Sequence, residues 1–110
     1  MNPGKLRHRV TLQEKQTGDN GIGGTIIEWV DFANVWASIE PLQGRELLMA
    51  QQVNPELDTR VRIRYRDGIG SHMRVVHKSR IYELEGPPIN PEERNIELEL
   101  MCKESGIYDG

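Results

Sequence analysis

Apolar and polar residues alternate along most of this 110-residue chain, which is the pattern of β-strands that bury one face. In residues 7–13, for example, Val10 and Leu12 share one face and Arg9 and Thr11 the other. The same alternation, or a high content of β-branched and aromatic residues, predicts further strands over residues 25–30, 34–40, 59–66, 73–77, 81–85 and 95–103.

Only residues 44–53, GRELLMAQQV, are rich in helix formers, and Asn54-Pro55 ends this predicted helix. The glycine-rich residues 17–24 predict a flexible hairpin loop, and residues 104–110 predict a frayed tail. Short strands without a βαβ rhythm indicate a single domain over residues 1–110. Its predicted class is mainly β, a small antiparallel β-barrel or sandwich of six to seven strands with one short helix.

Four arginines occupy alternate positions of TRVRIRYR and would form one charged row on a strand, opposite a face made of Val61, Ile63 and Tyr65. Glutamates alternate in the same way in IYELE and NIELELMCK, so charge pairing across strands is the favoured interpretation. A subunit interface and direct DNA contact are the alternatives. The residues concerned are Arg60, Arg62, Arg64, Arg66, Glu83, Glu85, Glu97 and Glu99.

Composition narrows these alternatives. The formal net charge of −3 argues against general affinity for nucleic acid, which draws on a basic field.

A single cysteine, Cys102, excludes an internal disulfide framework and a zinc site built from several thiolates. No stretch has the length and apolar character of a signal peptide or membrane span, so we expect a soluble protein without membrane contact.

Candidate catalytic chemistry is scarce in the sequence. His8, His72 and His77 do not have the spacing of metal ligands, and Cys102 alternates with apolar residues as a small buried side chain does. The glycine stretches GIGG and DGIG lack the pattern of phosphate-binding loops. We therefore expect no enzyme activity, no catalytic residue, no cofactor and no metal.

Six short motifs occur in order across residues 5–103. They are GKLRHRVTLQ, EWVD after the glycine-rich loop, VWASIEPLQGRE with MAQQV, RVRIRYRDGI, MRVVHKSRIYEL and ERNIELELMCKE. In this order the chain resembles the phage head–tail joining proteins of long-tailed bacteriophages, of the head-closure or stopper type.

The resemblance implies a small β-barrel without catalytic activity that forms part of the head–tail connector. Such a protein joins a ring, dodecameric in the family, beneath the portal and adaptor. There it closes the DNA-filled head and provides the docking surface for the tail. The implied partners are the adaptor and portal ring proteins, the tail terminator or tail completion protein, further copies of itself, and DNA that passes without sequence-specific binding. The implied location is the virion, after assembly in the host cytoplasm.

Residues 43–57 match the segment that faces the channel in this family, so the resemblance implies a channel gate there. The alternative is a fixed helix packed on the barrel. The gate residues would be Gln43, Gly44, Arg45, Glu46, Leu47, Leu48, Met49, Gln51 and Gln52.

The strands use most of the apolar residues, so we expect a monomer or weak oligomer in isolation and a ring only in the virion. Residues 17–24 and 86–93 are the candidate loops for reaching the adaptor and the tail, and the alternative is that both are plain solvent-exposed hairpin loops. The rival functions are a small nucleic-acid-binding β-barrel and a tail-completion protein of the same joint.

Overall fold

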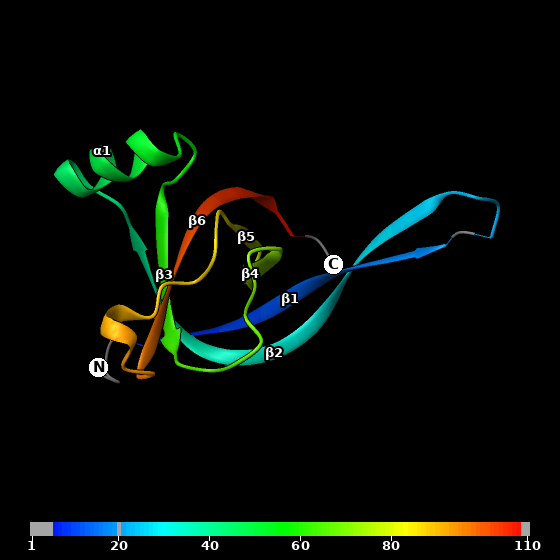
Figure 1. Ribbon diagram of the computed structural model, residues 1–110, viewed down its shortest axis with the longest axis horizontal. Helices are drawn as coiled ribbons and strands as arrows, with labels where there is room; N and C mark the ends of the chain where they lie inside the picture. The colour runs from blue at the N-terminus through cyan, green and yellow to red at the C-terminus, as the bar shows by residue number, and fades with distance from the viewer. Residues whose placement is uncertain (1–5, 20, 109–110) are drawn as a thin grey trace.

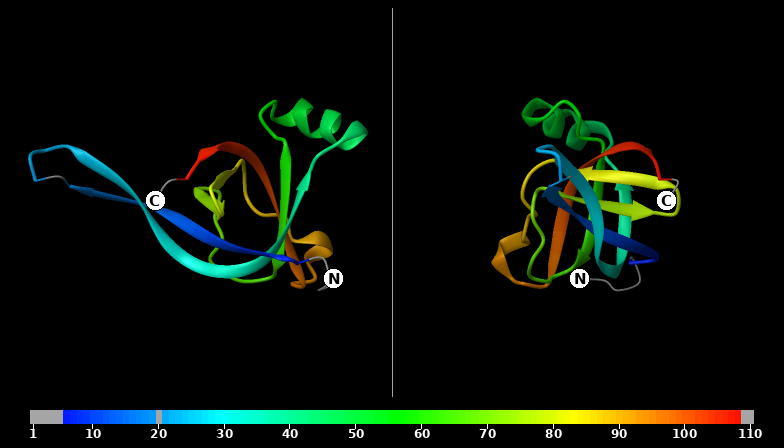
Figure 2. Two further views of the ribbon diagram at one scale, coloured as in Figure 1. Left: turned by 180° about the vertical axis from the view of Figure 1, so that it is seen from behind. Right: turned by 90° about the vertical axis from the view of Figure 1, so that its right-hand side faces the viewer.

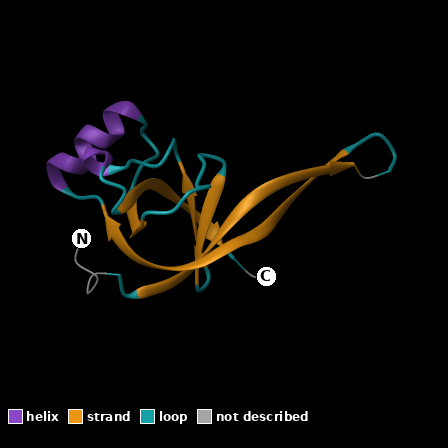
Figure 3. Cartoon of the chain, turned by 60° about the horizontal axis from the view of Figure 1, so that its bottom comes forward, coloured by secondary structure: helices purple, strands orange, loops and turns teal. Residues whose placement is uncertain are grey.

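The computed structural model describes residues 6–19 and 21–108, and most of them lie in six antiparallel strands that close into a barrel (Figure 1). Around the barrel the strands follow the order β1-β2-β3-β6-β5-β4, and β4 pairs with β1 again. Figure 3 shows how little of the chain is helical. The expected fold class is confirmed. The elements are β1 (His8–Asp19), β2 (Thr25–Pro41), α1 (Gly44–Val53), β3 (Thr59–Arg64), β4 (Met73–His77), β5 (Arg80–Leu84), the 3₁₀ helix η2 (Pro91–Glu93) and β6 (Glu97–Ile107).

The core fills the barrel with the apolar residues of each alternating pattern. Full burial of such a side chain contributes about 1.5–3 kcal/mol, so these few residues supply most of the stability of the domain. Cys102 is among them, and burial raises the pKa of its thiol well above the usual range. The most deeply buried side chains are Val10, Leu12, Val61, Ile63, Val75, Leu100 and Cys102.

The β1–β2 hairpin is longer than the barrel needs. β1 and β2 pair continuously from His8 opposite Ala37 to Asp19 opposite Thr25, with a bulge after Leu12. The barrel uses only part of this ladder, so the distal half of the hairpin projects as a two-stranded arm (Figures 1 and 2). The molecule accordingly measures 48 × 29 × 28 Å.

The strands of this hairpin are longer than the sequence pattern predicted. Residues 25–30 and 34–40, predicted as two strands, are one strand, and residues 17–19 of the predicted loop belong to β1. Residue 20 of that loop lies outside the described residues. The physical reason is that hydrophobic alternation marks where a strand covers a core, whereas the hydrogen-bonded ladder continues beyond the core.

Phe32 sits at the point where the arm leaves the barrel. Its ring packs against the core, and the guanidinium of Arg66 lies 5.3 Å from the ring centroid. Gly68 approaches from the loop after β3 with φ +90°, and a Cβ there would lie 2.8 Å from the ring. Only glycine meets both conditions, and the close approach holds this loop against the base of the arm.

The last strand extends further than expected. Glu104 to Ile107 belong to β6 and pair with β5, whereas the predicted strand ended at residue 103. The fraying expected over residues 104–110 remains a prediction, and residues 109 and 110 lie outside the described residues. The Tyr108 N–H donates a hydrogen bond to the Ser79 carbonyl at 2.7 Å. The Arg74 guanidinium lies 4.3 Å from the Trp29 ring centroid and 5.9 Å from that of Tyr108. Cation–π contacts thus join the arm to the end of the chain.

Two histidines meet where β1 lies beside the end of β4. The rings of His8 and His77 are 4.8 Å apart between centroids and inclined by 61°. Burial lowers the pKa of His77, and the nearby charges of His8, Lys78 and Arg80 lower it further. Both are structural residues of the barrel wall, and a charge on His77 is disfavoured in the folded state.

This pair predicts an acid-sensitive stability. The unfolded chain takes up a proton on His77 below the ordinary pKa of 6.5, while the folded chain resists protonation until a lower pH. The contribution of His77 to the free energy of unfolding is therefore present in full above about pH 6.5 and is lost as the pH falls below this value. Melting temperatures followed by circular dichroism between about pH 7.5 and pH 5 should fall less in His77→Gln than in the unaltered protein. The exposed residue His72 provides the control variant, His72→Gln. Equal acid sensitivity in all three proteins would rule the pair out as the cause.

Candidate assembly site

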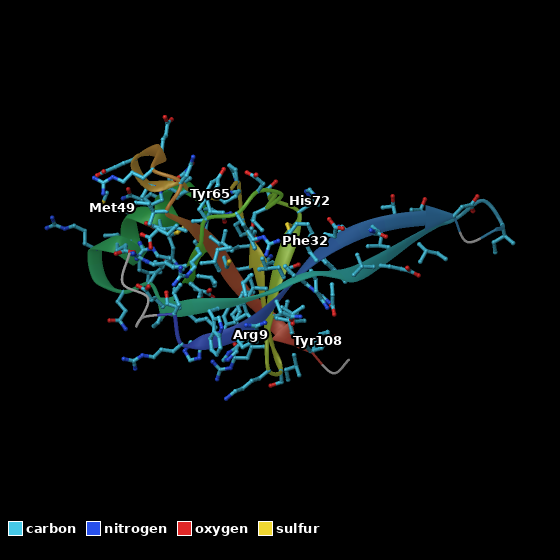
Figure 4. All side chains as sticks on the ribbon, turned by 90° about the horizontal axis from the view of Figure 1, so that it is seen from below. Arg9, Phe32, Met49, Tyr65, His72 and Tyr108 are labelled. Carbon is cyan, nitrogen blue, oxygen red and sulfur yellow. The ribbon has the colours of Figure 1, made fainter. Side chains whose placement is uncertain are left out.

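Helix α1 stands away from the barrel. None of its residues is buried, although it carries several apolar side chains. Leu48, Met49 and Val53 are 63%, 60% and 87% exposed. Figure 4 places Met49 at the end of the molecule opposite the arm. An amphipathic helix of a monomeric domain normally buries its apolar side chains, so these exposed residues mark α1 as a candidate contact surface.

Leu42 and Leu57, which flank α1 on either side and which we call the neck, join the helix to the barrel. Leu42 and Leu57 on either side of the helix are buried, and the Leu42 N–H donates to the Asp58 carbonyl at 3.0 Å. The Gln51 side-chain amide donates to the Leu57 carbonyl at 3.1 Å. The helix begins at Gly44 with φ +58°, a left-handed conformation that glycine adopts without strain. The segment is thus anchored at its two ends.

The predicted gate residues lie on this helix or immediately before it. Gln43 is its N-cap, and the helix expected over residues 44–53 coincides with α1. Gln43, Gly44, Arg45, Glu46, Leu48, Met49 and Gln52 are exposed, whereas Leu47 and Gln51 are half-buried.

Arg60 connects α1 to the outside of the barrel. Its side chain is only 15% exposed, and its guanidinium makes ion pairs with Glu99 on β6 at 3.2 Å and Glu40 on β2 at 3.8 Å. It also contacts the carboxylate of Glu46 on α1. One arginine therefore contacts acids on β2, α1 and β6.

The remaining arginines of the row have different surroundings. Arg62 pairs with Glu40 at 3.1 Å and with Glu97 at 3.6 Å. Arg64 is exposed and lies opposite Glu97 in the β3–β6 ladder. Arg66 lies beyond the end of β3 and stacks on Phe32 instead of extending the row. The exterior charges of β3 thus meet acids of the same chain.

The acids of β5 have another partner. Glu83 and Glu85 lie 3.9 and 3.5 Å from the Lys103 ammonium group, which also pairs with Glu56 at 2.9 Å. Sequence reasoning missed Lys103 and Glu40. Both lie at outward-facing positions of their strands, where they can form ion pairs. The sequence pattern does not reveal which strands become neighbours. It also missed Glu46, because nothing in the sequence places α1 beside β3.

The arm and the loop before β6 present further exposed apolar groups. Ile22, Ile26 and Ile27, at and near the tip of the arm, are 88%, 40% and 56% exposed. In the loop after β5, Ile89 forms a β-bridge with Glu99 and remains 47% exposed. This loop therefore runs along the barrel wall, whereas the arm extends into solvent.

Sites for small-molecule chemistry are scarce in the part of the chain that the structure describes. A cavity of about 280 Å³ is lined by His8, His77, Thr59 and the ion pair of Arg80 and Glu104. Within residues 6–19 and 21–108 there is no group of three histidines, cysteines or acids arranged to hold a metal ion. The same residues include no helix with the length and apolar character needed to cross a membrane.

Known proteins are similar to this chain in sequence. The chain is 29% identical to head completion protein gp16 of Bacillus phage SPP1 over 101 residues, which cover 92% of this chain and 93% of that protein. It is 26% identical to head completion protein gp7 of Enterobacteria phage HK97 over 108 residues, with coverage of 94% and 96%.

Two solved structures have the same fold. The solution structure of protein SF1141 from Shigella flexneri 2a matches with a TM-score of 0.79 and 26% identity, covering 96% of this chain and 97% of that one. A chain from the virion of a native gene transfer agent particle matches with a TM-score of 0.61 and 16% identity, covering 91% and 96%. At that identity the second likeness supports the fold alone.

The family model for phage head completion proteins matches residues 1–105, nearly the entire chain. The family expected from the six sequence motifs is thereby confirmed. This chain belongs to the phage head completion protein family and is a structural protein of the virion.

Proposed function

We propose that this protein closes the DNA-filled head at the exit vertex, as one subunit of a ring beneath the portal and adaptor. It acts there without catalysis and provides the surface on which the tail docks. The proposal rests on the resemblance and on family membership. The structural observation that supports it best is the exposed α1 segment, which presents Leu48, Met49 and Val53 away from the barrel.

The geometry of this segment favours the gate over the fixed helix. A helix packed firmly on the barrel would bury its apolar face, whereas Leu47 of α1 is only half-buried and Leu48, Met49 and Val53 are exposed. A ten-residue helix is marginal on its own, so its order depends on the neck and on the Glu46–Arg60 contact. In the proposed ring, residues 43–57 of each copy project toward the axis, and weak contacts between Leu48 and Met49 of neighbouring copies add up to a plug.

The charged exterior has a matching role in the proposal. Arg60 and Arg62 are occupied within the chain, which leaves exposed Arg64 as the member of the row most available to an acid of a neighbouring subunit. The exposed tip of the arm and the Ile89 loop are the proposed contacts with the adaptor and the tail.

The gate predicts DNA leakage from altered heads. When Arg45 to Gln52 are replaced by a short glycine bridge, heads should fill normally but lose DNA before tails attach. A milder variant, Leu48→Ser with Met49→Ser, should leak as well, because it removes the exposed apolar groups from the proposed plug. His72→Ser, an exposed residue outside the segment, is the control and should retain DNA. Nuclease-protected DNA per purified head measures the effect. Full DNA retention in the deletion variant would show that this segment is not the stopper.

The Glu46–Arg60 ion pair predicts how firmly α1 is held. Glu46→Gln should increase hydrogen exchange of the α1 amides about two- to fivefold, since a partly exposed ion pair contributes about 0.2–1 kcal/mol. The core strands should exchange as before. Arg45→Gln alters the neighbouring exposed residue and is the control. Unchanged exchange in Glu46→Gln would mean that the neck alone orders the helix.

The arginine row separates the assembly function from the rival nucleic-acid-binding function. Arg62→Ala and Arg64→Ala should each lower the free energy of unfolding by less than about 1 kcal/mol, because both side chains lie at the solvent-facing side of the barrel. Urea denaturation measures this. Gel-shift assays at physiological salt should show no tight binding of duplex DNA by any of the three proteins. Tight binding that Arg62→Ala abolishes would favour the nucleic-acid-binding barrel.

A further inference from the structure

The projecting arm has two open edges among the described residues. β2 pairs with β3 only over Ala37–Pro41, and β1 pairs with β4 only over Thr11–Glu14. Residues 25–36 of β2 and 15–19 of β1 therefore use one side for pairing within the hairpin, and no backbone hydrogen bond joins their other side to the rest of the described chain.

The β2 edge has little of the usual protection against strand addition. Proteins protect exposed edges with proline, with charged side chains, lysine above all, or with very short strands. Residues 25–36 contain no proline and no lysine, their charged residues are Glu28 and Asp31, and β2 is 17 residues long. Ile26 and Ile27 are exposed along this stretch. An added strand would gain backbone hydrogen bonds and contacts with these side chains.

The chain itself supplies a matching strand. Lys15 lies opposite Trp29 and Asp19 opposite Thr25, so the open stretch of β1 is at the same height on the arm as the distal half of β2. Two copies in the same orientation would place β2 of one beside β1 of the next, and these strands would run antiparallel. The contact is heterologous, so it can repeat around a ring.

We propose that neighbouring copies pair through their arms, with the β2 edge of one copy adding to the β1 edge of the next. This inference rests on the ring of the proposed function and names the contact that joins its subunits. Side chains on the arm remain largely exposed in such a ladder, so little apolar area is buried. The pairing is accordingly weak in free solution and becomes stable where copies are held side by side.

Engineered cysteines test the pairing. One set of proteins carries Thr17→Cys or Asp19→Cys on β1, and a second set with a size tag carries Thr25→Cys or Ile27→Cys on β2. These four residues share one face of the hairpin, and their combinations cover three neighbouring registers. The native Cys102 is fully buried and does not compete. His72→Cys, exposed in the loop before β4 and outside both proposed contact surfaces, is the control. Mixtures are oxidised at high protein concentration and within assembled heads.

The expected result is a disulfide-linked dimer between a β1 variant and a β2 variant, at least about tenfold above the His72→Cys control. A disulfide requires Cα atoms about 4.4–6.8 Å apart, and directly opposite residues of paired antiparallel strands meet this condition. Dimers formed equally well by Ile27→Cys or Thr25→Cys alone would overturn the proposal in favour of a symmetric β2–β2 contact. So would control-level dimer in every mixture from heads that contain the protein. Heads that lack the protein would instead contradict the proposed function, and the concentrated mixtures would then decide the pairing.

Discussion

Closure of the β-ladder is the constraint on which the rest of the structure depends. Six strands enclose a core of small and medium apolar side chains, and closure leaves the barrel itself without a free edge. Closure uses only part of β1 and β2 and none of residues 43–57. Those parts project from opposite ends of the barrel (Figures 1 and 4) without a core of their own. The barrel is thus a rigid base for two extensions that gain burial only through contacts with other molecules.

The charged residues on the outside of the barrel fit this division between a barrel and two extensions. Arg60 and Arg62 are neutralised by glutamates of neighbouring strands, so an acidic chain carries an arginine-rich strand without presenting a basic surface. The same Arg60 contacts Glu46 and so ties α1 to the wall through a polar contact. A polar contact at a partly exposed site is weak and can be exchanged for others. In the proposed function, α1 adds weak contacts with neighbouring copies to this one.

The sequence predicted the barrel and α1 well and the arm poorly, for one physical reason. Val10, Leu12, Val61 and Ile63 alternate with polar residues because they face the core, and this pattern located the strands that build it. The distal arm has no core to face, so no alternation revealed that β1 reaches Asp19 or that β2 is continuous.

Pairing between distant segments was the second limit. Of the glutamates expected to meet the arginine row, Glu99 and Glu97 pair with Arg60 and Arg62, whereas Glu83 and Glu85 meet Lys103. Glu40 and Glu46, which were not expected there, also meet the row. Strand order in a barrel is a tertiary property that a single strand's pattern does not encode. The candidate gate was placed by the resemblance. Its helical form was predicted by composition, and its separation from the barrel emerged only from the structure.

The central claim is that this barrel sits at the exit vertex with its two extensions committed to neighbours. Electron cryo-microscopy of DNA-filled heads without tails tests it most directly. The account predicts a ring of barrels at that vertex, with α1 directed toward the channel axis and each arm lying against the next subunit. Barrels located elsewhere on the head, or a ring whose α1 segments point outward from the axis, would contradict it.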